Sequence, residues 1–97
     1  MSTETITKPV AKQRTCPMYK VIMHNDDITH MDFVVQVLVN IFNREPLDAF
    51  KIMLEIHNQG QGLAGVYSLE HAELRVEQCH SLARTRKFPL TCTIEPA

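Results

Sequence analysis

Residues 18–35 read Met-Tyr-Lys-Val-Ile-Met-His-Asn-Asp-Asp-Ile-Thr-His-Met-Asp-Phe-Val-Val, and they hold the most informative pattern in the chain. Over residues 18–24, alternating side chains that include several β-branched and aromatic residues predict a strand. Asn25, Asp26 and Asp27 follow directly. We expect these three residues to end the strand, because short polar side chains bond their own backbone and favour turns.

A helix is predicted immediately after this turn. Thr29 is the expected N-cap, with Asp32 in the capping-box position. Apolar residues then recur with a helical period over about residues 31–43. The predicted buried face consists of Met31, Val34, Val35, Leu38 and Phe42. Polar acceptors at a strand–helix junction, next to an apolar wall, favour a binding site, although the same residues are also typical of a simple turn with a helix cap.

Composition and charge narrow the class of protein. The chain has 97 residues, enough for one small domain, and its formal net charge is −1. That balance gives no general attraction to nucleic acid or to an anionic membrane. One basic cluster, residues 84–87, falls at a predicted helix end, where the helix dipole accounts for it. We therefore expect neither nucleic acid nor a membrane as a partner.

The cysteines indicate a reducing compartment. Cys16, Cys79 and Cys92 are odd in number, and none belongs to a C-x-x-C pair. Such usage is typical of a cytosolic protein rather than of a disulfide framework. No signal peptide is visible, and no apolar run approaches the ~20 residues of a membrane span. The predicted location is the cytoplasm, or the plastid stroma if the source is a plant.

The rest of the chain completes one domain. Residues 1–16 lack an apolar period and are predicted to be a flexible, disordered extension. Pro46 opens a second helix that runs to about residue 58. After it, the sequence predicts a strand over residues 63–67, a helix that is capped by Ser68 and ends before Phe88, and a strand over residues 90–94. The order βααβαβ predicts a compact α+β domain over residues 17–97, with three antiparallel strands and three helices packed on them.

The spacing of apolar residues predicts which face of the second and third helices is buried. In the second helix, Leu47, Phe50, Met53, Leu54 and His57 share one predicted apolar face. In the third, the predicted buried residues are Leu69, Ala72, Val76, Cys79 and Ala83, while Glu73, Arg75 and Glu77 face outward. A lone histidine on an apolar face, such as His57, is more often a core residue than a ligand. Zinc-type spacing is lacking, and no cofactor or metal is expected.

Two motifs resemble the ClpS adaptor family of bacteria and plastids. The first is Tyr19-Lys20-Val21-Ile22 with Asn25-Asp26-Asp27 and Thr29-x-Met31-x-Phe33-Val34. The second is Met53-Leu54-Glu55-Ile56-His57-Asn58-Gln59-Gly60. His24, Ile28 and His30 depart from the family pattern at the rim of the site. The resemblance implies a non-enzymatic adaptor that binds proteins with destabilising N-terminal residues, Phe, Tyr, Trp or Leu. It also implies delivery to the N-terminal domain of a Clp AAA+ unfoldase of the ClpA or ClpC type.

The same resemblance assigns residues to roles. The substrate's α-amino group would be bound by Asn25, Asp26, Asp27 and His57. The hydrophobic pocket would comprise Met23, Ile28, Thr29, Met31, Val34, Met53, Ile56 and Leu90. The unfoldase would dock at Glu70 and Arg75, at the start of the third helix. No catalytic residue is implied, and the protein is expected to be a monomer.

Two other classes stay open on the residues themselves. An interaction domain could bind a partner helix in an apolar groove without reading an N-terminus. A small hydrolase or metal protein could use Asp26, Asp27 and His57, although no serine or cysteine lies in an evident nucleophile setting.

Overall fold

A computed structural model describes residues 16–97. Its elements run in the order β1 (Met18–His24), α1 (Met31–Asn40), α2 (Pro46–Gln59), β2 (Gln61–Ser68), α3 (Leu69–Thr85) and β3 (Thr91–Pro96). The predicted α+β class and the order βααβαβ are thereby confirmed. The predicted flexible extension, residues 1–16, lies outside the described residues except for Cys16.

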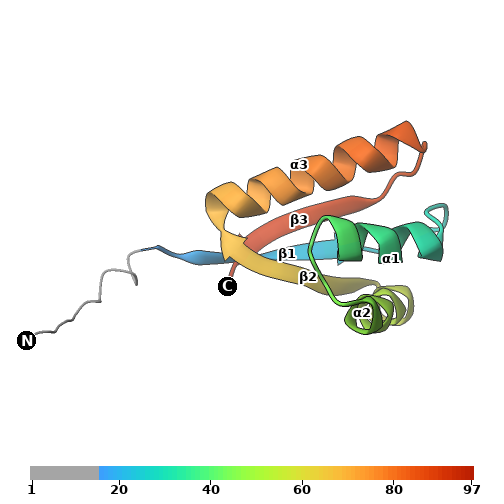
Figure 1. The fold of residues 1–97 in the computed structure, drawn as a ribbon, viewed down its shortest axis with the longest axis horizontal. Coiled ribbons are helices and arrows are strands. Elements are labelled where there is room, and N and C mark those ends of the chain that lie inside the picture. Colours follow the sequence, from blue (N-terminus) through green and yellow to red (C-terminus); the bar gives the residue numbers. More distant parts are fainter. Residues whose placement is uncertain (1–15) are drawn as a thin grey trace, which may run out of the picture.

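The three strands form one antiparallel sheet with β1 in the middle, in the order β2-β1-β3. In Figure 1, α3 runs along the sheet while α1 and α2 lie near the end at which β1 finishes. Val21 and Met23 of β1 are fully buried and join apolar residues from all three helices in a single core cluster. Burial of this face against the helices supplies the main driving force for folding.

Helix α1 is shorter than predicted, ending at Asn40 instead of about residue 43. Asn43 adopts a left-handed backbone conformation with φ of 55°. The N–H of Arg44 then donates to the carbonyl of Leu38 over 3.0 Å. Asparagine tolerates this conformation better than most residues, so it closes the helix before Pro46 opens α2.

The predicted cap of α1 is wrong. His30 is the N-cap residue and makes no side-chain cap hydrogen bond. The Thr29 hydroxyl instead donates to the Asp26 carboxylate over 2.7 Å. An acidic side chain three residues earlier therefore takes the hydroxyl that would otherwise be free to cap the helix.

The predicted apolar face of α2 is also largely wrong. Leu47, Phe50 and Leu54 are exposed, and so is His57. The residues that are buried are Ala49, Ile52, Met53 and Ile56. Apolar residues occupy two adjacent faces of this helix, and spacing alone did not choose between them.

Close approach to β2 selects the face that is buried. A Cβ placed on Gly62 would lie 2.8 Å from Cγ1 of Ile56, so the strand can pass this close to α2 only as glycine. In the other helices the predicted faces are mostly buried, with Met31 and Leu69 as exposed exceptions.

Candidate binding site

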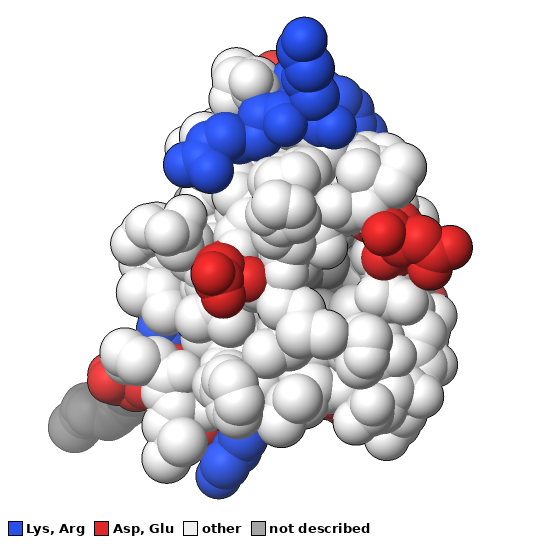
Figure 2. Space-filling view, turned by 90° about the vertical axis from the view of Figure 1, so that its right-hand side faces the viewer, with Lys and Arg blue, Asp and Glu red and all other residues white. Residues whose placement is uncertain are grey.

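A cavity of about 220 Å³ lies between the β1–α1 loop, α1 and the C-terminal half of α2. Figure 2 views the end of the molecule that carries this loop, and it shows a depression between two groups of acidic side chains. The cavity is lined by Asn25, Asp26, Asp27, Thr29, Met31, Val34, Met53, Ile56 and His57. All nine belong to the set that the sequence singled out, although they come from two segments far apart in the chain.

Two backbone features bring these segments together. The N–H of Asn25 donates to the carbonyl of Gly60 over 2.9 Å, which fastens the β1–α1 loop to the end of α2. Gly60 ends α2 in a left-handed conformation with φ of 93°, where a residue without a Cβ is favoured. His57 lies in the last turn of the same helix. The loop and the histidine therefore keep a fixed relation to each other.

Asp26 organises the loop. One of its oxygens accepts the N–H groups of Ile28 and Thr29 over 2.8 and 2.7 Å, and the other accepts the Thr29 hydroxyl. Partial burial raises the pKa of Asp26, but the bonds from Thr29 and Ile28 and the charge of Arg84 outweigh it, so the pKa lies below its usual value. Asp26 thus stays charged and holds the turn that forms one wall of the cavity.

Three polar side chains remain available at the mouth of the cavity. Asn25, Asp27 and His57 are all exposed, and all three line the same space. An amide oxygen, a carboxylate and a neutral imidazole nitrogen are each hydrogen-bond acceptors. Together they can receive a donor-rich cation.

The inner part of the cavity is apolar. Val34, Met53 and Ile56 are buried, whereas Met31 is 42% exposed and stands at the rim. A much smaller hollow adjoins this part and reaches Leu90, which is almost fully buried. The site therefore combines a polar mouth with an apolar interior, the usual composition of a site for a small amphipathic group.

Two residues assigned to the pocket lie elsewhere. Met23 is fully buried in the core and does not line the cavity. Ile28 is 62% exposed and lines a different hollow, beside the loop between α3 and β3. The bonds to Asp26 turn the chain at Ile28, so its side chain leaves the pocket side. Conversely, His24, which was noted at the rim of the site but given no binding role, lines the small adjoining hollow.

The two residues assigned to unfoldase docking differ in setting. Glu70 is exposed in the first turn of α3. Arg75 was expected to face outward, but it is half-buried and donates to the carbonyl of Ile41 over 2.7 Å. Its guanidinium also lies 5.3 Å from the centre of the Tyr67 ring. Arg75 therefore joins α3 to the end of α1 as well as reaching the surface.

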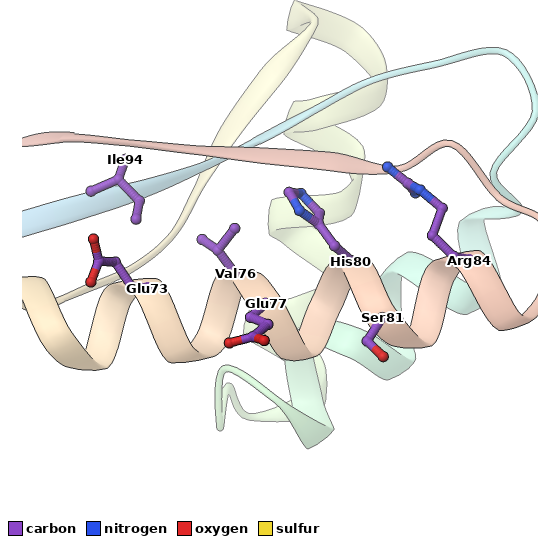
Figure 3. A pocket seen from close by; sticks show the side chains of 7 residues that line it. All are labelled: Glu73, Val76, Glu77, His80, Ser81, Arg84 and Ile94. Carbon is purple, nitrogen blue, oxygen red and sulfur yellow. The ribbon is translucent and has the colours of Figure 1, made fainter.

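A larger, open hollow of about 510 Å³ lies between α3 and β3 (Figure 3). In this view His80 and Arg84 extend from α3 toward β3. His80 Nε2 accepts the N–H of Cys92 over 2.9 Å, and Arg84 donates to the carbonyl of Leu90 over 3.0 Å. Burial, together with the charge of Arg84, lowers the pKa of His80, which favours the neutral acceptor form. These groups cover the outer edge of β3 and do not converge on the space between them.

Other kinds of site find no support in the part of the chain that the structure describes. Within residues 16–97, no group of three or more His, Cys, Asp or Glu side chains is arranged to hold a metal ion. No helix there is long and apolar enough to cross a membrane. Cys79 and Cys92 are buried free thiols whose sulfur atoms lie 3.8 Å apart.

The chain is similar to known proteins over most of its length. A family model described as ATP-dependent Clp protease adaptor protein ClpS matches residues 14–93. A protein of that name from Desulfatibacillum aliphaticivorans is 47% identical over 93 residues, covering 96% of this chain and 89% of the relative. The one from Shewanella denitrificans is 50% identical over 80 residues, covering 82% of this chain and 78% of the relative.

A solved structure has the same fold. Agrobacterium tumefaciens ClpS2 bound to L-phenylalaninamide superposes with a TM-score of 0.81 and is 30% identical, covering 84% of this chain and 99% of that chain. Its ligand pairs a free α-amino group with an apolar aromatic side chain, the same two chemistries that the cavity described above offers.

Proposed function

Because the chain belongs to the ClpS family of ATP-dependent Clp protease adaptor proteins, which are adaptors and not enzymes, we propose that its cavity binds the N-terminal residue of proteins destined for degradation. The favoured first residues are Phe, Tyr, Trp and Leu. The observation that carries the proposal is the convergence of Asn25, Asp27 and His57 at the mouth of an apolar cavity. The phenylalaninamide bound to the Agrobacterium relative supports it.

The polar mouth suits a free α-amino group. Such a group has a pKa of about 7.7–8.0 and, when charged, presents three N–H donors. Asn25, Asp27 and His57 supply the three acceptors, while Asp26 positions the loop. An internal peptide N–H offers one donor and no charge, so it leaves acceptors unused. The site thereby distinguishes a chain terminus from the interior of a chain.

The apolar interior suits a large side chain without branching at Cβ. Val34, Met53 and Ile56 form its walls, and Leu90 lies beyond them. Burying a Leu or Phe side chain contributes about 1.5–3 kcal/mol, and each charge-assisted hydrogen bond contributes about 1.5–3 kcal/mol. Several kcal/mol are lost in immobilising the peptide, so micromolar or somewhat tighter binding is the expected result.

A peptide array that varies only the first residue tests this proposal. Phe, Tyr, Trp and Leu should be retained, whereas Ile, Val, Ala and charged residues should not. A second row with acetylated N-termini should lose binding, because acetylation removes the charge and two donors. If the acetylated row binds equally well, the cavity is an apolar groove for internal segments or partner helices, and the proposal is wrong.

The partner in degradation is part of the same proposal. We expect the adaptor to deliver its cargo to the N-terminal domain of a Clp AAA+ unfoldase of the ClpA or ClpC type. Glu70 and Arg75, both in the N-terminal half of α3, are the proposed docking residues. We also expect the protein to be a monomer that acts in the cytoplasm, and the free Cys79 and Cys92 thiols are typical of such a reducing compartment.

Removal of residues 1–16 should separate binding from delivery. The proposed domain, residues 17–97, contains the whole cavity, so the truncated protein should bind a Phe-initiated peptide with unchanged affinity. Degradation of a Phe-initiated model protein by the reconstituted unfoldase and protease should be lost, because the polar extension is proposed to engage the unfoldase. Full delivery by the truncated adaptor would show that the extension is passive.

A further inference from the structure

We propose that positive charges beside the cavity select substrates that carry acidic residues directly after the N-terminal residue. This inference rests on the proposed function, since it concerns the segment of substrate that leaves the cavity. The surface is a hollow of about 360 Å³ lined by Ile28, Arg84, Lys87, Phe88 and Pro89. We call these five residues, together with the neighbouring Arg86, the basic rim. Figure 2 shows Lys and Arg side chains gathered above the depression on this end of the molecule.

The basic rim is continuous with the binding cavity. Asp26 lines the cavity, and its carboxylate accepts the N–H of Ile28, which lines the rim. In the loop between α3 and β3, Pro89 of the rim directly precedes Leu90, which lines the small hollow adjoining the cavity. Substrate residues two to four extend at most ~3.6 Å each from the bound terminus. They therefore emerge within reach of the rim.

The rim is held in a fixed shape. Arg84 donates to the carbonyls of Phe88 and Leu90 over 2.7 and 3.0 Å. The Phe88 ring packs against the rings of His30 and Phe33, with both pairs of centroids 5.0 Å apart. The loop between α3 and β3 therefore presents its charges from a framework attached to the pocket wall.

Two further contacts hold the charged residues themselves. The Arg86 guanidinium lies 5.4 Å from the centre of the Phe33 ring. Lys87 occupies the left-handed turn, with φ of 63°, that ends α3. Packing on Phe33 thus positions the charge of Arg86, and the turn sets the direction in which the Lys87 side chain leaves the backbone.

The charge on this surface departs from that of the whole protein. The net charge is −1, yet no acidic side chain lines the rim hollow. The negative charge of Asp26 offsets part of the positive charge of Arg84. Asp27 lines the cavity that is proposed to receive the substrate's ammonium group. Arg86 and Lys87 are both exposed to solvent. The electrostatic field of an exposed charge extends about 8 Å at physiological salt. The rim can therefore attract carboxylates on substrate residues two to four without direct contact.

The test uses fluorescence anisotropy with matched peptides that begin with Phe and carry Glu, Gln or Lys at positions two to four. Glu should strengthen binding about 2- to 5-fold per ion pair relative to Gln, and Lys should weaken it. The difference should shrink as salt is raised. Lys87→Glu should reduce or reverse the preference while leaving the affinity for the Gln peptide nearly unchanged.

Lys51→Glu is the matched control, since it changes the net charge equally from an exposed position on α2 that lines neither the cavity nor the rim. Equal affinity for the Glu and Lys peptides, or an equal response to the two substitutions, would overturn the proposal. The acetylated Gln peptide distinguishes failure of the rim proposal from failure of the proposed binding of a free N-terminus. If acetylation abolishes binding but charge has no effect, only the rim proposal fails; if acetylation has no effect, both fail.

Discussion

An Asn25→Ala protein is expected to bind a Phe-initiated peptide about 10- to 150-fold more weakly than the wild type, and His57→Ala should have a similar effect. Either change leaves one N–H of a desolvated ammonium group without its acceptor, which costs about 1.5–3 kcal/mol. Folding should be unaffected at both positions. Asn25 is fastened to Gly60 through its backbone N–H, which alanine retains, and His57 is exposed.

The measurement is an anisotropy titration, with circular dichroism to verify the fold. Asn58→Ala is the matched control, because Asn58 is the exposed neighbour of His57 and does not line the cavity. It should bind as the wild type does. Unchanged affinity in a correctly folded Asn25→Ala or His57→Ala protein would exclude the proposed ammonium site.

Met53→Ala is expected to change both stability and specificity. Met53 is 5% exposed, belongs to the core and lines the cavity. Truncating a buried methionine to alanine typically costs about 2–5 kcal/mol of unfolding free energy. The thioether chain should also crowd the Cβ of a bound residue, where Ile and Val carry two substituents and Leu and Phe carry one. Relieving that crowding is worth about 1–3 kcal/mol, or 5- to 150-fold in affinity.

Met53→Ala should therefore admit Ile- and Val-initiated peptides and bind Leu and Phe slightly less well. The decisive quantity is the ratio of Leu to Ile affinities, measured alongside the melting temperature. Met31→Ala is a useful comparison because Met31 lines the same cavity but is 42% exposed, so it should cost less stability. If Met53→Ala lowers stability while the ratio stays at the wild-type value, Met53 is only core filler.

The order of elements could be predicted because the local signals agreed with the final packing. Three local signals predicted elements that the structure contains. They are the period of two in β1, the polar residues 25–27 that end this strand, and Pro46 at the start of α2. That two of these segments form one cavity was implied by the resemblance to the ClpS family and not by local pattern. The assembly of the cavity depends on the bond between Asn25 and Gly60, which no local pattern announces.

The remaining errors arise where tertiary contacts decide. Helix α2 carries apolar residues on two faces, and the buried one is the face that Gly62 of β2 approaches closely. Ile28 adjoins three site residues, yet the bonds to Asp26 direct it onto the basic rim. The basic cluster at residues 84–87 was explained by the helix dipole alone. The cluster lies beside the cavity because the loop between α3 and β3 shares a hollow with Ile28 of the β1–α1 loop, a tertiary contact that spacing does not encode.

The covered edge of β3 would matter for an adaptor that meets partly unfolded proteins, as the proposed function requires. An open strand edge is a template on which exposed segments of other proteins add and from which fibrils grow. Here His80 of α3 accepts the N–H of Cys92 within the strand, Arg84 donates to the carbonyl of Leu90 just before it, and Pro96 has no N–H to offer. This edge of the sheet is therefore less open to the addition of another strand, and the protection comes from side chains of a neighbouring helix.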